Sequence, residues 1–180
     1  AGRPRGMLPP VLQDEGALEV LNTVLCLTIN LVEKDDDNCR AFAKARAAAG
    51  PGGSPRHEIV PLLCALVCSV HTDGEGEGDD SADELTEEDL LDHDRAGEAA
   101  IVKAYAACLL GFLIQRDGGR RAQAEKLLPG GTLESVVSVL ERFCAFHTHT
   151  RTMTIEQSTS LEQLIRSLKG AQGERAAAGP

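Results

Sequence analysis

The stretch ALEVLNTVLCLTINLVE, residues 17–33, decides the fold because its apolar residues repeat at the spacing of an α-helix. They form two stripes on neighbouring faces, Leu18, Leu21, Leu25, Ile29 and Val32 in the first, and Val20, Val24, Leu27 and Leu31 in the second. The part VLCLTINLV alone would also fit a β-strand, but the full length favours a helix. A helix that is apolar on two faces is expected to be packed on both sides, as in the inner layer of a helical stack.

The chain beyond this helix repeats the same pattern. Apolar periodicity predicts further helices over residues 39–49, 57–71, 98–116, 120–128, 132–146 and 155–169. Thr154 and Gln157 form a capping box at the start of the last helix. Pro129-Gly130-Gly131 is a firm helix stop, and Gly111 is expected to allow the close approach of a neighbouring helix.

This order of elements predicts an all-α fold of six or seven helices in pairs of about 35 to 45 residues. Such pairs indicate an α-solenoid fragment of the HEAT or armadillo kind, and a compact helical bundle is the alternative. The expected organisation is a poorly ordered segment (1–16), helical repeats (17–72), a disordered acidic insertion (73–95), further helical repeats (96–169) and a disordered tail (170–180).

The net charge of −10 comes from one segment. Residues 73–94 hold 12 acids and no Lys or Arg, which leaves 16 of the 28 acids for the rest of the chain, against 18 bases. Outside that segment the best basic cluster is Arg116, Arg120, Arg121 and Lys126, which is more typical of a solvated face than of a phosphate-binding track. We therefore expect no direct nucleic-acid binding.

The acidic segment also matches much of the EF-hand pattern of a calcium-binding loop. DGEGEGDDSADEL, residues 73–85, places acids at EF-hand positions 1, 3 and 5, Gly78 at position 6 and Glu84 at position 12. However, Asp80 occupies position 8, where a hydrophobic residue normally pairs two loops, and no second loop is present. An acidic linker without a metal is the preferred interpretation.

The sequence gives little support to a zinc site or to catalysis. Cys64, Cys68 and His71 share a helix face but lack a fourth zinc ligand, and His147 and His149 are interpreted as polar residues after the end of a helix. Six cysteines without a CxxC pair indicate buried free thiols in a reducing compartment. No catalytic motif occurs, so we expect no enzyme, no cofactor and no small-molecule substrate.

Composition excludes two further classes of protein. Aromatic residues make up only 3% of the chain, too few to favour base stacking or an aromatic ligand pocket. No apolar run reaches the roughly 18 to 20 residues that span a bilayer, and the start AGRPRGMLPP has no apolar signal segment. We therefore expect a soluble chain that does not contact a membrane.

Three blocks of the sequence resemble the Wings apart-like (Wapl) family. Ile29-Asn30-Leu31-Val32-Glu33, followed by Asn38 and Arg40, is similar to the family's "INLVE…NR" helix and turn. After the acidic insertion, IVKAYAACLLGFLIQ (residues 101–115) looks like the family helix "IVASY…LLLG". Leu128-Pro129-Gly130 and VLERFCAF (residues 139–146) are similar to its "LP-G" turn and "L-x-x-F" helix. The resemblance covers residues 20–42 and 98–168, with the blocks in the family's order.

The resemblance implies the C-terminal end of the conserved Wapl domain, a HEAT-like solenoid. It also implies a non-enzymatic regulator of sister-chromatid cohesion, located on nuclear chromatin, that promotes cohesin release. The implied partners are the cohesin ring subunits and their HEAT-repeat accessory protein. Glu33, Asn38 and Arg40 are the candidate partner-binding residues, although Asn38 could instead cap the next helix and Arg40 could pair with Glu33 or Asp37.

Two other functions remain open at this point. One is an acidic calcium-binding regulator, which depends on residues 73–85. The other is a generic armadillo-type scaffold with unrelated partners.

Overall fold

Helices make up almost all of the part of the chain that the structure describes. The computed structural model describes residues 15–45, 58–69 and 87–177. The helices are, in chain order, α1 (Glu15–Val32), α2 (Asp36–Ala43), α3 (Ile59–Ser69), α4 (Glu87–Ile114), α5 (Gly118–Leu127), α6 (Glu134–Thr150) and α7 (Ile155–Ala177), with a short 3-10 turn, η2 (Pro129–Gly131), before α6. The predicted all-α class is confirmed over these residues.

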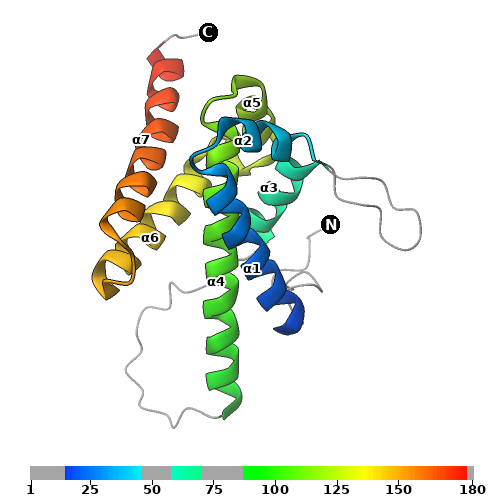
Figure 1. Cartoon of the computed structure of the whole chain (residues 1–180), viewed down its shortest axis with the longest axis vertical. Helices are drawn as coiled ribbons and strands as arrows, with labels where there is room; N and C mark the ends of the chain where they lie inside the picture. The colour runs from blue at the N-terminus through cyan, green and yellow to red at the C-terminus, as the bar shows by residue number, and fades with distance from the viewer. Residues whose placement is uncertain (1–14, 46–57, 70–86, 178–180) are drawn as a thin grey trace, which may run out of the picture.

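Helix α4 is the centre of the arrangement (Figure 1). α1 and α3 pack on one side of it, α6 packs on the other, and α7 lies outside α6 and reaches α4 as well. The last turns of α4, residues 106–114, are buried all round, and Leu109, Leu110, Leu113 and Ile114 are all at most 1% exposed. A helix segment enclosed in this way must be apolar on every face, which the sequence of these residues satisfies.

This enclosure also explains the membrane-like character of α4. Residues Gly97–Ile114 are long and apolar enough to cross a bilayer by length and composition, contrary to the expectation that no such run exists. Yet 67% of this stretch is buried against the other helices, and Glu98 and Lys103 interrupt it. The core helix of a soluble protein has the same properties.

Helix α1 differs from its prediction on one face. Leu18, Leu25 and Val32 of the first stripe are buried against the core. The second stripe is exposed to solvent, with exposed fractions of 52% to 63% for Val20, Val24, Leu27 and Leu31. The prediction that α1 is packed on both sides is therefore wrong within the described part of the chain, because α2 and α4, its main neighbours there, lie elsewhere around it.

Three helix ends also differ from the predictions. α4 begins at Glu87 rather than Glu98, inside the segment predicted to be disordered. α6 continues to Thr150, and α7 continues past Gly170 to Ala177. Periodicity of apolar residues locates the buried part of a helix, so it misses polar extensions that lie outside the core.

Local signals at the turns are confirmed. The amide of Gln157 donates to Thr154 Oγ1 over 3.2 Å, and the amide of Thr154 donates to Gln157 Oε1 over 3.0 Å, which completes the capping box. Gly130 and Gly131 have φ values of 69° and 67°, a conformation that glycine adopts without strain. A Cβ at Gly111 would lie 3.0 Å from Leu164 Cδ2, so α4 and α7 make the predicted close approach there.

Candidate interaction surface

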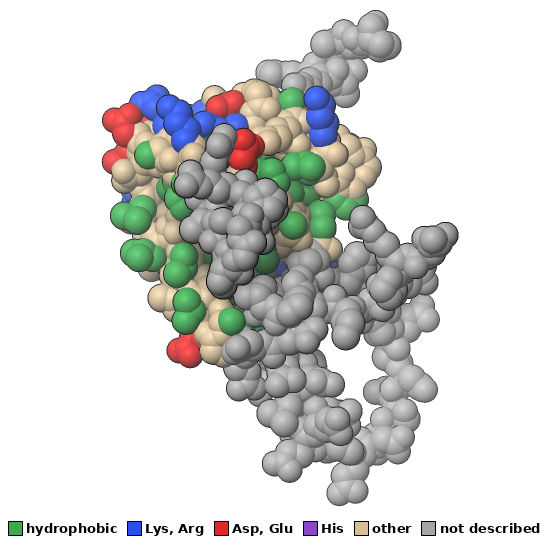
Figure 2. All heavy atoms as spheres, turned by 90° about the vertical axis from the view of Figure 1, so that its right-hand side faces the viewer, with side chains coloured by type: hydrophobic (Ala, Val, Ile, Leu, Met, Phe, Trp, Pro, Cys, Tyr) green, Lys and Arg blue, Asp and Glu red, His purple; other side chains and the backbone are tan. Residues whose placement is uncertain are grey.

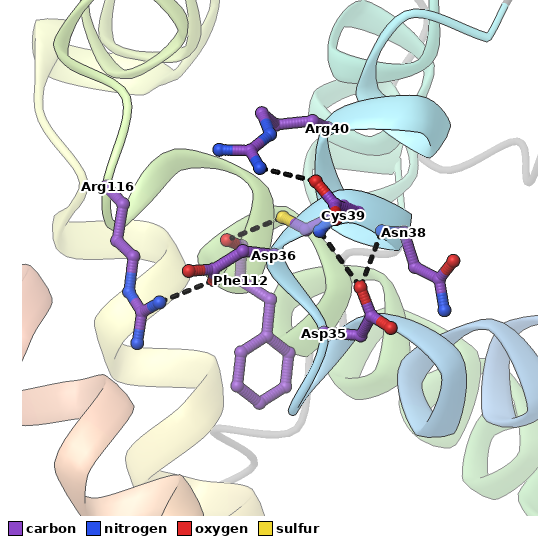
Figure 3. Close-up of polar contacts among 8 residues, drawn as sticks. Asp35, Asp36, Asn38, Cys39, Arg40, Phe112 and Arg116 are labelled. Carbon is purple, nitrogen blue, oxygen red and sulfur yellow. Dashed lines mark hydrogen bonds and ion pairs between the residues drawn. The ribbon is translucent and has the colours of Figure 1, made fainter.

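The turn between α1 and α2 is fixed by a cap at each helix end (Figure 3). Asp35 Oδ1 accepts hydrogen bonds of 2.9 Å from the amides of Asp37 and Asn38, so Asp35 is the N-cap of α2. The side chain of Asn38 points back and donates to the carbonyl of Leu31 over 3.1 Å. Asn38 thus caps the end of α1 and not the start of the next helix.

The same turn is tied to the end of α4. The Cys39 thiol lies 3.4 Å from the carbonyl of Phe112, and the Arg116 guanidinium pairs with Asp36. Arg40 pairs with Asp37 on the outer side of the turn. Of the two partners suggested for Arg40 by the sequence, Asp37 is the one present.

The three predicted partner-binding residues therefore do not form one cluster. Asn38 and Arg40 are exposed in helix α2. Glu33 is half-buried and lines a pocket between α1, α4, α6 and α7. Their assignment to partner binding remains a prediction.

A groove that sequence analysis missed runs between α4 and α6. It has a volume of about 410 Å³ and an apolar floor, with Lys103 and Arg142 among its lining residues. Ile101 and Phe146 line it and are 38% and 61% exposed. Burial, and then the charge of Arg142, lower the pKa of Lys103.

Three of the five aromatic residues line this groove, although their small number argued against an aromatic site. Tyr105 and Phe143 meet edge to face with ring centroids 5.7 Å apart. His147 packs on both Phe143 and Phe146, at centroid distances of 4.3 and 5.3 Å. Composition counts aromatic residues but carries no information on whether the fold brings them together.

A second exposed apolar surface is the outer stripe of α1, formed by Val20, Val24, Leu27 and Leu31. Figure 2 shows hydrophobic side chains gathered on the face of the described molecule that it views. Exposed apolar patches of this kind are typical of protein–protein contacts.

The other candidate chemistry is largely accounted for by internal contacts. In the basic cluster, Arg116 pairs with Asp36, Arg120 with Asp117, and Arg121 is buried beside Glu125. Three of its four cations thus have a carboxylate partner within the fold, and the absence of direct nucleic-acid binding remains a prediction.

The metal candidates find no support in the described residues. Residues 73–85 and His71 lie outside the described part of the chain, so the calcium loop and the Cys64–Cys68–His71 set are untested there. Among the described residues no group of three or more His, Cys, Asp or Glu side chains converges on a metal position. His147 and His149 lie inside α6, not after its end, and His147 Nδ1 hydrogen-bonds with Thr152 Oγ1.

All six cysteines are free thiols. Burial raises the pKa of Cys64 to about 11 and that of Cys108 to about 12. Because the thiolate is the reactive form, these two residues act as packing groups and not as nucleophiles. The expectation for Cys64 and Cys108 is confirmed, whereas Cys26 is exposed.

Comparison with known proteins identifies the family. Wings apart-like protein 1 of Arabidopsis thaliana is 31% identical over 159 residues, which are 84% of this chain. Wings apart-like protein 2 of the same plant is 31% identical over 156 residues, again 84% of this chain. The chain belongs to the Wings apart-like family. No family model matches it.

The chain corresponds to only part of its Wapl relatives. The matched regions make up 17% and 19% of the lengths of the two Arabidopsis proteins. The match is broader than the three blocks noticed in the sequence, since it extends over 84% of the chain. The activity and partners of a whole Wapl protein therefore enter only as a proposal for this chain.

The structure places the three Wapl-like blocks around α4. Residues 29–32 form the end of α1, residues 101–114 form the C-terminal half of α4, and residues 139–146 lie in α6. Gly111 of the second block receives Leu164 of α7, and Phe143 of the third contacts Tyr105 of the second. The Wapl-like residues are thus mainly those that hold α1, α6 and α7 on the central helix.

Proposed function

We propose that this chain is a non-enzymatic part of a cohesin regulator, which binds cohesin ring subunits and their HEAT-repeat accessory protein and promotes cohesin release from nuclear chromatin. The observation that carries the proposal is the match to two Wapl proteins over 84% of the chain. The solenoid stacking expected of such a protein belongs to the same proposal.

The groove between α4 and α6 supplies a contact surface for this function. Aromatic and large aliphatic side chains at the centre of a contact carry most of its binding energy. Phe146 and Ile101 are such side chains, and they are exposed beside a concave apolar floor. Lys103 and Arg142 beside it favour an acidic partner surface.

The non-enzymatic part of the proposal is supported by the chemistry of the described side chains. The buried thiols have raised pKa values and the cations of the basic cluster mostly pair with carboxylates. Among the described residues, the pockets on either side of α6 are lined mainly by apolar and aromatic side chains that pack between helices.

Purified components test the binding step directly. The chain is immobilised, recombinant cohesin ring with its accessory protein is passed over it, and the dissociation constant is measured. We expect binding by the wild-type chain and a loss of about tenfold or more in the Ile101→Glu, Phe146→Glu double variant, because each substitution puts a charge into an apolar contact.

Ile155→Glu is the matched control. Ile155 is 87% exposed at the start of α7 and does not line the groove, so this variant should bind as the wild-type chain does. A wild-type chain that fails to bind purified cohesin would contradict the proposed function. Equal binding by the double variant would exclude the α4–α6 groove as the contact surface.

A further inference from the structure

A small pocket lies between α1, α4, α6 and α7 and shares Tyr105, Phe143 and His147 with the groove just described. Its volume is about 190 Å³. Sites for drug-sized ligands have roughly 300 to 1,000 Å³, so this pocket suits a single long side chain better than a cofactor. The ion pair between Lys34 and Glu156 joins α1 to α7 beside it, next to the lining residues Glu33 and Gln157.

The walls of this pocket combine aromatic rings with hydrogen-bonding groups. Tyr105, Phe112 and Phe143 supply the rings, and Phe143 stands nearly perpendicular to Tyr105 at an interplanar angle of 78°. Asn30 of α1 supplies an amide group, whereas the amide oxygen of Gln157 already accepts hydrogen bonds from Thr154 in the capping box of α7. Such a mixture recognises a side chain that is apolar along its stem and polar at its tip.

Glu33 gives the pocket its charge. Among the described residues of the lining, Glu33 is the only carboxylate, none is Lys or Arg, and His147 contributes an imidazole. The ammonium of the neighbouring Lys34 forms an ion pair with Glu156. This ion pair raises the pKa of Lys34 and lowers that of Glu156. Among the described side chains no cation forms an ion pair with Glu33.

The charge of Glu33 acts at the apolar floor as well. Cys108 lies there, 6% exposed, and its thiol pKa is raised to about 12 by burial first and by the Glu33 carboxylate next. A carboxylate that is half-buried among apolar groups is stabilised strongly by an opposite charge, because little water screens the pair.

We propose that this pocket binds the side chain of an arginine carried by an extended segment of a partner protein. The guanidinium lies against Glu33, and the three-carbon stem lies along the aromatic rings of the wall. A guanidinium is planar, offers five donors to carboxylate and amide oxygens, and stacks on aromatic faces, so it uses every feature of these walls. A leucine would fill the same volume but would leave Glu33 covered without a partner.

This inference goes beyond the proposed function, because it concerns a different pocket and does not depend on cohesin being the partner. Its test uses short peptides and not cohesin. Failure of one proposal is therefore distinguishable from failure of the other.

Methionine labelling gives a direct readout. The chain has two methionines, Met7 and Met153, and Met153 lines the pocket. The whole chain with 13C-methyl methionine is titrated with the heptapeptide Gly-Ser-Gly-Arg-Gly-Ser-Gly, followed by the same peptide with citrulline or leucine in place of arginine. Citrulline keeps the shape of arginine and removes its charge.

We expect the arginine peptide to shift the Met153 signal in a saturable way and to bind about tenfold or more tightly than the citrulline and leucine peptides. Glu33→Gln should weaken the arginine peptide by a similar factor and leave the other two unchanged. Glu19→Gln, an exposed residue on the same helix outside the pocket, should bind as the wild-type chain does.

Three results would overturn the proposal. Equal binding of the leucine peptide would make the pocket a site for an apolar anchor. Unchanged binding by Glu33→Gln, with the fold verified by its thermal unfolding curve, would remove the carboxylate from recognition. The absence of any Met153 shift with the arginine peptide would mean that the pocket does not take this side chain.

Discussion

At the scale of single residues, the side chains around α4 are selected for size as well as for polarity. Gly111 sits where Leu164 of α7 crosses α4, and Leu164 is only 1% exposed. A glycine inside a helix costs about 1 kcal/mol relative to alanine, so its presence here indicates that the close approach of α7 is worth more than the lost helix propensity. The sequence alone supported this interpretation, because Gly111 lies in the middle of an apolar helical arc.

Replacing Gly111 tests this contact. Gly111→Val should lower the free energy of unfolding by about 1 to 3 kcal/mol, since its added atoms overlap Leu164 in a closed core. Gly97→Val is the matched control in the same helix, where a Cβ meets nothing within 4 Å, and it should change stability by no more than about 0.5 kcal/mol. Urea unfolding followed by circular dichroism measures both. Similar losses in the two variants would mean that α7 does not approach α4 at this glycine.

At the scale of helices, periodicity and capping chemistry predicted the existence of each element. The capping box of α7 and the glycine turn of η2 were predicted correctly because hydrogen bonds between near neighbours in sequence determine them. The exposed outer stripe of α1 was not predicted, since Val20, Val24, Leu27 and Leu31 have the periodicity of a buried face. Whether an apolar face is covered depends on which helices lie beside it, and that is a tertiary property.

The candidate surfaces were harder to predict for the same reason. Glu33 was selected from the sequence, but its pocket is built from four helices, with Tyr105 and Phe143 contributed by α4 and α6. The groove beside Phe146 likewise requires α4 and α6 to be placed side by side. The residues that line such a site are far apart in the sequence and few in number. No local sequence pattern therefore indicates the site.

Removing the cap of α7 tests the local determinant of this helix. Thr154→Ala should cost about 1 kcal/mol, because the amide of Gln157 loses its hydrogen bond to Thr154 Oγ1. Thr159→Ala, five residues further along α7, removes an exposed hydroxyl that bonds to the carbonyl of Ile155, and it should be neutral or slightly stabilising because alanine is the better helix former. Thermal unfolding of both variants gives the comparison, and a Thr159→Ala loss as large as that of Thr154→Ala would contradict the role of the cap.

At the scale of the whole molecule, α7 is attached to the rest at separate places that belong to different helices. Its apolar side packs on α6 and on α4 at Gly111, Lys34 of the α1–α2 turn pairs with Glu156 at its start, and Lys169 pairs with Glu141 of α6. The exposed ion pairs contribute little, because water and salt screen them. The buried polar contact of α7 is that of Arg121, which is 5% exposed in α5 and donates to the carbonyl of Leu168 over 2.6 Å.

Arg121 therefore connects α5 to α7 across the core, and its loss should affect the whole molecule. Arg121→Met keeps the apolar stem but removes the bonds to Leu168 and Glu125, and it should lower the free energy of unfolding by about 1.5 to 3 kcal/mol. Arg166→Met removes an exposed guanidinium 3.8 Å from Glu162 and should change stability by less than about 0.5 kcal/mol. Urea unfolding at two salt concentrations separates the cases, since the buried contact of Arg121 is screened little by salt. If Arg121→Met is as stable as the wild-type chain, then α7 is held on the core by apolar packing alone.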